Sequence, residues 1–304
     1  MKRWALLLLC AALFACGVRV APESEALETQ TAAPTPEETP VRTTPETTPE
    51  TTPVTFSPAP TEAPTPSPTP EPTAAPEIID EERLASGEFD PYFDDAVFVG
   101  DSITATFRNY VTGQRAISEG FLGEAKFLGV TNMSAIRAAR NSVGSDGINF
   151  RFRGRELCFT DAIRETGAKK VFILLGVNEL VWCTWEDETA AFSKMFELIR
   201  SVDPDAEIVV QALLPVTERY CKSERLQIDT WNSFNEVLSA LCEENEVAFL
   251  SFAEQVMDEN GYLDVSLSID KEYHLNEKGE AIWVAALRRY AAARIYPDAI
   301  FVTP

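Results

Sequence analysis

The sequence predicts an α/β domain built around a parallel sheet and preceded by a long segment that has no core of its own. Short apolar runs, each about the length of one buried strand, recur along residues 86–304. Amphipathic stretches long enough to form helices separate these runs. Strands that alternate with helices favour a parallel sheet covered by helices on both faces. Residues 86–304 are enough for one such domain.

The individual elements follow from the same patterns. The five apolar runs, each predicting one strand, are 96–100, 125–130, 170–176, 208–215 and 247–252. The four stretches with helical patterns are 156–167, 186–202, 223–245 and 276–293. The second of these places Ala191, Met195 and Ile199 on a single face, as expected of a helix that covers a sheet.

Residues 1–16 have the pattern of an export signal. Two cationic residues precede an apolar run, 4–14, that is too short to span a bilayer. The following Leu13-Phe14-Ala15-Cys16 resembles a bacterial lipoprotein signal, which implies that Cys16 is lipidated and becomes the mature N-terminus. A two-chain lipid anchor is enough for stable membrane attachment. An ordinary cleaved signal or an uncleaved anchor is the alternative, and every version places the rest of the chain outside the cytoplasmic membrane, at the cell surface.

Residues 17–85 are expected to be a disordered tether rich in threonine, proline and glutamate. They hold 15 of the 20 prolines and 15 threonines but few large apolar side chains. Such a segment buries too little apolar surface to offset the entropy lost on ordering. Because proline favours extended conformations, the segment is typical of a spacer that holds a domain away from a membrane.

Composition excludes several classes of function. The formal net charge is −22, and a nucleic-acid partner is not expected because phosphate contacts need clustered cations. The chain has one histidine and no Cys-X-X-Cys spacing, so we expect no metal site and no cofactor. The folded part has four cysteines, Cys158, Cys183, Cys221 and Cys242, which allow three disulfide pairings.

Three polar residues are predicted to meet at one edge of the sheet. Ser102 follows the first strand in Gly100-Asp101-Ser102, Asn178 follows the third strand, and His274, the only histidine, precedes the last helix. Each residue alone fits a structural role such as a turn or a helix cap. Active groups of parallel sheets collect at the carboxyl ends of the strands, so the joint occurrence of the three predicts an active site.

The order and spacing of these residues resemble the SGNH/GDSL hydrolase family over residues 93–293. The resemblance implies a flavodoxin-like three-layer α/β/α sandwich and the hydrolysis of acyl esters. It implies that Ser102 is the nucleophile and that His274 is the base that activates it. It also implies an oxyanion hole made by the Ser102 backbone N–H, the Asn178 side chain and a backbone glycine, with Gly129 as the candidate. Asn132 remains an alternative to Gly129, because the family's second motif is indistinct here.

The sequence also departs from the family pattern around the histidine. The family's aspartate normally lies three residues before the histidine, where this chain has Lys271. Asp270, four residues before, is the first candidate to orient the imidazole, and Glu272 is the second. A Ser-His dyad without a carboxylate is the third option. A further departure, Glu179 in place of an aspartate after Asn178, falls at a position that is not expected to take part in the chemistry.

Two tryptophans, Trp182 and Trp185, follow Asn178 closely and are candidate substrate-binding residues, since flat aromatic faces suit sugar rings. Packing beneath the loop is the alternative.

The sequence therefore predicts a surface-tethered serine esterase that removes acetyl or short acyl groups from envelope or exogenous polysaccharide through an acyl-serine intermediate. Its substrates would be acylated carbohydrates or small esters. One alternative is an O-acetyltransferase that acts on a cell-envelope glycan and needs a membrane partner to donate the acyl group. The other is a catalytically inactive module that binds the wall or a glycan, which the displaced aspartate suggests.

Overall fold

The central sheet has five parallel strands in the order β3-β2-β6-β7-β8. The computed structural model describes residues 76–180 and 182–302. The strands are β2 (Ala96–Gly100), β3 (Lys126–Gly129), β6 (Lys170–Leu174), β7 (Glu207–Gln211) and β8 (Ala248–Leu250). Each strand overlaps one of the five predicted runs, and the parallel pairing confirms the predicted fold class.

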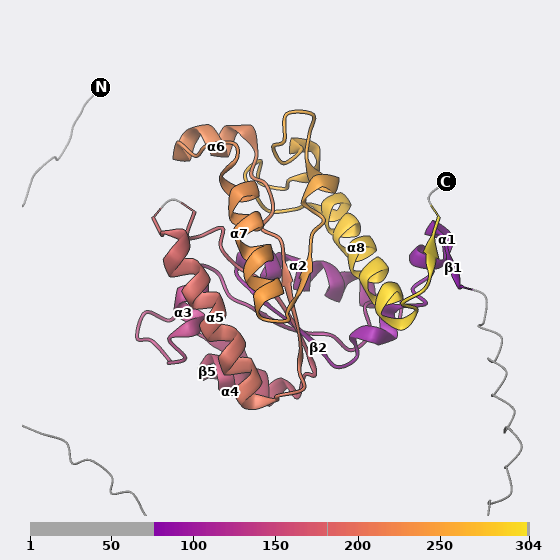
Figure 1. Ribbon diagram of the computed structural model, residues 1–304, viewed down its shortest axis with the longest axis horizontal. Helices are drawn as coiled ribbons and strands as arrows, with labels where there is room; N and C mark the ends of the chain where they lie inside the picture. Colours follow the sequence, from indigo (N-terminus) through magenta and orange to yellow (C-terminus); the bar gives the residue numbers. More distant parts are fainter. Residues whose placement is uncertain (1–75, 181, 303–304) are drawn as a thin grey trace, which may run out of the picture. The chain divides into compact units, whose positions relative to one another are not determined.

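Helices cover both faces of this sheet and complete a three-layer α/β/α sandwich (Figure 1). Helices α2 (Ser102–Arg115) and α8 (Glu277–Ile295) pack against each other on one side. The other layer is made by α3 (Ala135–Ala139), α4 (Phe159–Thr166), α5 (Trp185–Val202) and α7 (Thr230–Glu244). After β2 the chain adds β3 on one side of that strand and then β6 on its other side, so the strand order switches between β2 and β6. In such folds, ligands bind at the carboxyl ends of the strands beside this switch point.

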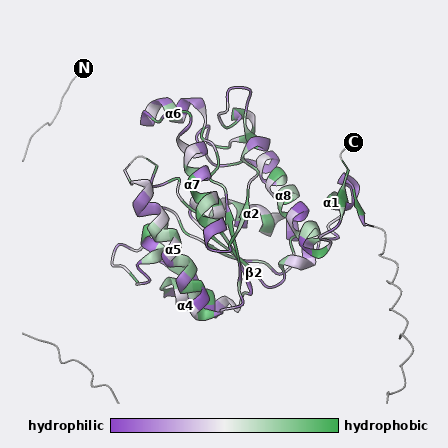
Figure 2. Cartoon of the chain, viewed as in Figure 1, coloured by the Kyte–Doolittle hydropathy of each residue, from purple (hydrophilic) through white to green (hydrophobic). Residues whose placement is uncertain are grey.

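The core between the layers contains a cluster of packed aromatic rings among its aliphatic side chains. The Phe98 ring in β2 stacks between Phe127 and Phe172 of the neighbouring strands, with centroid distances of 5.3 and 4.8 Å. On the α2 and α8 side, Phe107 stacks on Trp283 at 4.0 Å. Strand β2 is correspondingly hydrophobic along its length, and the helices present hydrophilic residues on part of their surface (Figure 2). Large buried rings of this kind contribute much of a domain's hydrophobic stabilisation.

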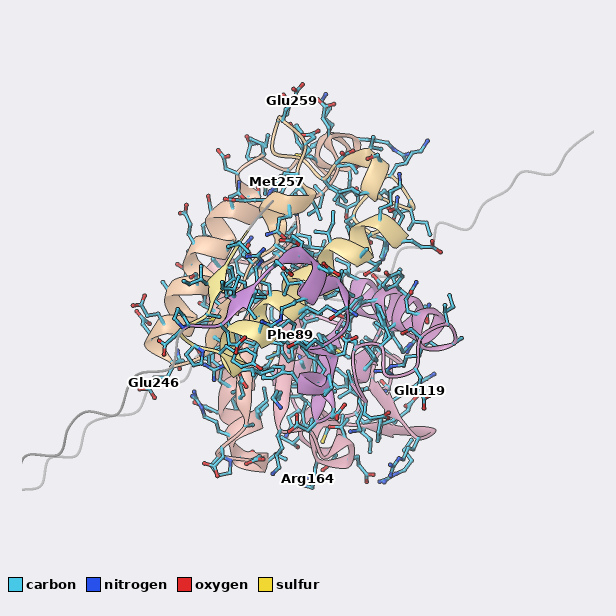
Figure 3. The ribbon with its side chains drawn as sticks, turned by 90° about the vertical axis from the view of Figure 1, so that its right-hand side faces the viewer. Phe89, Glu119, Arg164, Glu246, Met257 and Glu259 are labelled. Carbon is cyan, nitrogen blue, oxygen red and sulfur yellow. The ribbon has the colours of Figure 1, made fainter. Side chains whose placement is uncertain are left out.

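The folded part begins before residue 86, where we expected the tether to end. β1 (Ile78–Ile79) pairs in parallel with β9 (Ile300–Phe301), and α1 (Glu81–Ala85) packs on α8. Leu84 of α1 is buried, and the next segment adds the buried Phe89, which lies near the middle of the view in Figure 3, whereas the exposed Glu119 and Glu246 lie at opposite edges of that view. The apolar residues Ile78, Ile79 and Leu84 were too few to stand out beside the proline-rich sequence.

Two helix predictions need correction. The stretch 223–245 is divided between two helices, α6 (Glu218–Glu224) and α7, because Arg225 adopts a left-handed backbone with φ of 58° and ends α6. The helix expected at 156–167 starts only at Phe159, because the residues before it form an antiparallel hairpin of β4 (Phe150–Phe152) and β5 (Arg155–Leu157). Helices 186–202 and 276–293 are confirmed within one or two residues at each end as α5 and α8.

Within residues 76–180 and 182–302, no helix has both the length and the apolar character needed to cross a membrane. The four cysteines of this part are free thiols, so none of the three possible disulfide pairings is present. The predicted signal, the lipid site at Cys16 and nearly all of the predicted tether lie outside the described residues.

Candidate active site

Ser102 is held at the start of α2 by a tight connection from β2. Strand β2 ends at Gly100, Asp101 caps the helix by accepting a hydrogen bond from the Ile103 N–H at 2.8 Å, and Ser102 is the first helical residue. A side chain at Gly100 would come within 2.0 Å of Thr104 Oγ1, and one at Gly129 within 2.5 Å of the Ala105 backbone nitrogen. The two glycines therefore let the first turn of α2 approach β2 and β3 closely, which fixes the position of Ser102.

The side chains of Ser102, His274 and Asp270 form a continuous chain of contacts. His274 Nε2 lies 2.8 Å from Ser102 Oγ, and His274 Nδ1 lies 2.5 Å from Asp270 Oδ2. His274 ends the loop that precedes α8, and Asn276 caps that helix by accepting from the N–H groups of Lys278 and Gly279. The three residues lie 172 positions apart in the chain at most, and the fold brings them within hydrogen-bond reach.

The aspartate four residues before the histidine reaches the imidazole because Lys271 adopts a left-handed backbone. Its φ is 63°, which is uncommon for a residue with a side chain. The turn lets Asp270 Oδ1 accept from the Glu272 N–H at 2.8 Å and, at 3.4 Å, from the His274 N–H. The alternative candidate, Glu272, directs its carboxylate toward Arg219 at 3.5 Å. Of the options left open by the sequence, Asp270 is the one that contacts the imidazole.

Asp270 is placed to act as an ionised hydrogen-bond acceptor. Burial alone would raise its pKa, but hydrogen bonds from His274, the Glu272 N–H and Ser268 outweigh burial and hold the pKa below its usual value. An ionised Asp270 accepts the Nδ1 proton of His274. The Nε2 atom is then the acceptor for the Ser102 hydroxyl, which is the tautomer that a general base requires.

The third predicted residue, Asn178, lies after β6 beside the same crevice. Its side-chain amide donates to the Met133 carbonyl oxygen at 2.9 Å and to Asp101 Oδ2 at 3.3 Å. These two contacts join the loop after β6 to the loops after β3 and β2. Asp101 is fully buried, and burial raises its pKa to about 7.

The predicted oxyanion donors are less evenly supported. Gly129 is the last residue of β3, beside Gly100, and the close approach of α2 is sufficient reason for a glycine there. Asn132, the alternative, is exposed and has a left-handed backbone with φ of 61°. These observations do not show which N–H groups would face the oxyanion. The roles of Gly129 and Asn178 in an oxyanion hole therefore stay predictions.

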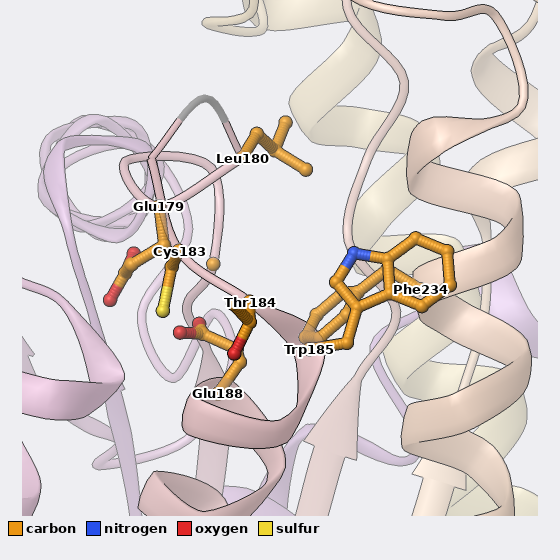
Figure 4. A pocket seen from close by; sticks show the side chains of 8 residues that line it. Glu179, Leu180, Cys183, Thr184, Trp185, Glu188 and Phe234 are labelled. Atoms are coloured by element: carbon orange, nitrogen blue, oxygen red, sulfur yellow. The ribbon is translucent and has the colours of Figure 1, made fainter.

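Two buried carboxyl groups lie near the end of β6, one on Glu179, the residue after Asn178, and the other on Glu188 in α5. Glu179 and Glu188 are 2% and 3% exposed, and within the described part of the chain none of their four oxygens has a partner with good hydrogen-bond geometry, although Ser134 and the Ala135 and Ile136 N–H groups lie near Glu179 and the Cys183 thiol lies near Glu188. Together with Cys183 they form one side of a pocket whose other side is Trp185 and Phe234 (Figure 4). Burial raises the pKa of Glu179 to about 7, and burial together with the charge of Glu179 raises the pKa of Glu188 to about 8. The sequence offered one overlooked signal, since Glu188 falls on the apolar face of α5.

These carboxyl groups are expected to make the fold less stable as the pH rises. A carboxyl whose pKa is higher in the folded than in the unfolded state favours folding at low pH, and that contribution is lost between about pH 4.5 and pH 8. At pH 9 we expect Glu188→Gln to have a higher unfolding temperature than the wild type, corresponding to a gain of about 1–3 kcal/mol in the free energy of unfolding. At pH 5 we expect little gain in either quantity. Thermal unfolding across this range is the measurement, and Glu186→Gln, an exposed change on the same helix, is the control. An equal shift at both pH values would contradict the prediction.

Of the two predicted tryptophans, Trp185 lines this pocket and Trp182 lies in the loop that precedes it. Trp182 is 62% exposed, and its indole N–H donates to the Asn178 carbonyl oxygen at 2.6 Å. Trp185 is 40% exposed and packs against Phe234 at the first turn of α5. Trp182 is therefore not packed beneath the loop, whereas Trp185 is partly packed against α7, and a role of either residue in substrate binding stays a prediction. Among the residues that the structure describes, no group of three or more acidic, histidine or cysteine side chains is arranged to hold a metal ion.

Comparison with known proteins is consistent with this geometry. A family model described as the GDSL-like lipase/acylhydrolase family matches residues 98–282. A GDSL-like lipase from Bacteroides thetaiotaomicron is 15% identical, with a TM-score of 0.50 over 70% of this chain and 97% of that one. A proposed acylhydrolase from Bacteroides fragilis is 13% identical, with a TM-score of 0.51 over 66% and 88% of the two chains. At such identities the likeness establishes the fold alone. No curated protein matches the chain.

Proposed function

The chain belongs to the GDSL-like lipase/acylhydrolase family, and we propose that it is a serine esterase that removes acetyl or short acyl groups from polysaccharide. One observation carries the proposal. The contacts from Ser102 Oγ to His274 Nε2 and from His274 Nδ1 to Asp270 join a hydroxyl, a base and an orienting carboxylate. This is the arrangement that activates a serine for acyl transfer.

The proposed reaction has two steps. Ser102 Oγ attacks the ester carbonyl carbon while its proton passes to His274 Nε2, and the same proton is then given to the departing alcohol. A water molecule attacks the acyl-serine in the second step and loses a proton to His274, which returns that proton to Ser102 Oγ as the acid leaves. The Ser102 backbone N–H lies at the N-terminus of α2, where unpaired N–H groups and the helix dipole favour the negative oxygen of the intermediate.

A sugar ester is the substrate class that the exposed surface favours. Trp182 is anchored to the Asn178 carbonyl and still leaves more than half of its surface open to solvent. An exposed aromatic face that is hydrogen-bonded to the residue after β6 suits stacking on a sugar ring, and an aromatic side chain loses little conformational entropy on binding.

Attachment to the membrane through Cys16 is part of the proposal and rests on the sequence of residues 1–16. We expect a labelled fatty acid to be incorporated into the protein in its bacterial host and to be lost in Cys16→Ala. Cys10→Ala, which changes the other cysteine of the signal, is the matched control and should keep the label. A wild-type protein that takes up no label would contradict the anchor and leave the esterase proposal untouched.

The esterase proposal is tested by treating the protein with a fluorophosphonate and then with an acetylated polysaccharide. We expect a mass shift that maps to Ser102, no shift in His274→Ala, and acetate release by the untreated protein only. Transfer of acetyl to an added glycan without net acetate release would support the transferase instead. A folded protein that binds glycan but is not modified at Ser102 would overturn the enzyme assignment in favour of a binding module.

A further inference from the structure

The first turn of α6 holds the loop that carries Asp270 and His274. Thr217, the residue that caps α6, is 2% exposed. Its hydroxyl donates to the Lys271 carbonyl oxygen at 2.8 Å, and its backbone N–H donates to the Glu272 carbonyl oxygen at 2.8 Å. One residue of the loop after β7 therefore satisfies two consecutive carbonyl groups of the loop before α8.

These two carbonyl groups belong to the part of the loop that is unusual. Lys271 is the left-handed residue that turns Asp270 toward the imidazole, and an unsupported left-handed lysine costs free energy. A partly buried carbonyl group left without a hydrogen-bond partner would add a further cost. Since threonine is branched at Cβ, the direction of its hydroxyl is restricted, and this contact is therefore suited to hold the backbone of Lys271 in place.

A second contact from the same helix turn reaches the imidazole. Tyr220, three residues after Thr217, packs edge-on against Tyr273 with a centroid distance of 5.0 Å. The Tyr273 ring in turn lies 4.5 Å from the His274 ring, tilted by 39°. Thr217, the cap of α6, and Tyr220, in its first turn, therefore both contact the loop that carries Asp270 and His274. One holds its backbone and the other supports the ring next to His274.

We propose that Thr217, assisted by Tyr220, is a positioning residue that keeps His274 and Asp270 aligned with Ser102. The proposal rests on the proposed esterase function and extends it to a residue that touches neither substrate nor triad side chains. It also accounts for an aspartate four residues before the histidine. The extra residue, Lys271, is tolerated because Thr217 supplies the partner that its turned carbonyl needs.

Thr217→Val keeps the shape of the side chain but removes its hydroxyl. We expect kcat for a small soluble ester to fall about tenfold, with KM nearly unchanged, since misalignment of the base affects the transition state more than substrate binding. The rate of fluorophosphonate labelling at Ser102 should fall by a similar factor. Thr217→Ser, which keeps the hydroxyl, should restore both rates to within about threefold.

Thermal unfolding separates this role from simple helix capping. A capping role alone would lower the unfolding temperature of Thr217→Val and leave kcat per folded molecule unchanged, and that result would overturn the proposal. If Thr217→Val does not fold, Tyr220→Ala provides the second test, with a reduced kcat expected and an unchanged kcat contradicting it. An intact protein with no reactivity at Ser102 would remove the proposed function and this inference together. Reactive wild type with a fully active Thr217→Val would remove only the inference.

Discussion

Replacing Ser102 with alanine is expected to reduce ester hydrolysis by about 10⁴- to 10⁶-fold, close to the rate without the triad. The hydroxyl is the only group at the start of α2 that lies within 2.8 Å of His274 Nε2, so no neighbouring side chain among the described residues takes over as nucleophile. Activity on a small soluble ester and labelling by a fluorophosphonate are the two measurements. Both should disappear together.

The fold of Ser102→Ala should be preserved, because Ser102 donates no hydrogen bond that holds α2 in place. Asp101 caps that helix, and the close contacts of Gly100 fix its first turn. Unfolding temperature and circular dichroism therefore serve as controls. Ser118→Ala, an exposed serine beyond the end of α2, is a matched substitution that should leave activity unchanged. Residual hydrolysis in Ser102→Ala above about one hundredth of the wild-type rate would contradict the assignment of the nucleophile.

The parts of the fold that could be predicted are those that are encoded locally. Each central strand is a continuous apolar run followed by a polar residue, and Ser102 and Asn178 stand where two of these runs end. A parallel sheet then places both residues at one edge without any knowledge of tertiary contacts. His274 could be predicted as the base because it is the only histidine in the chain and precedes the last predicted helix.

The features that were missed depend on contacts between distant residues. The strands β1 and β9 have two residues each and pair across more than two hundred positions, so neither carries a pattern of its own. The end of α6 depends on the left-handed conformation of Arg225, which cannot be predicted from a sequence of helix-forming residues. The burial of Glu179 and Glu188 could not be predicted for the same reason, since it depends on which residues pack around them in the fold.

The third triad residue illustrates the limit most clearly. From the sequence, Asp270, Glu272 and a dyad without a carboxylate were all open, because the spacing to His274 differs by one residue from the family pattern. The choice depends on the backbone of Lys271, and that conformation is supported by Thr217, which is 54 residues away in the chain. A local pattern therefore identified the loop that carries the candidate catalytic histidine but left open which carboxylate contacts the imidazole.

Asp270→Asn is expected to lower kcat about 10⁴-fold while leaving the fold and KM nearly intact. An asparagine amide in this place would donate to His274 Nδ1 and force the imidazole proton onto Nε2, which then cannot accept the proton of Ser102. The pKa of Asp270 is held below its usual value, so its ionisation does not limit wild-type activity above about pH 5. The loss in Asp270→Asn should accordingly be present across the neutral range rather than at one pH.

Glu272→Gln provides the comparison that decides between the two carboxylates. Its side chain contacts Arg219 at the surface, and only its backbone takes part in the loop, so we expect its kcat to stay within about twofold of the wild type. Steady-state kinetics of both variants between pH 5 and pH 9, with unfolding temperatures as controls, complete the measurement. A large loss in Glu272→Gln with an active Asp270→Asn would reverse the assignment. Small effects in both would indicate a Ser-His dyad, in which the loop backbone alone orients the imidazole.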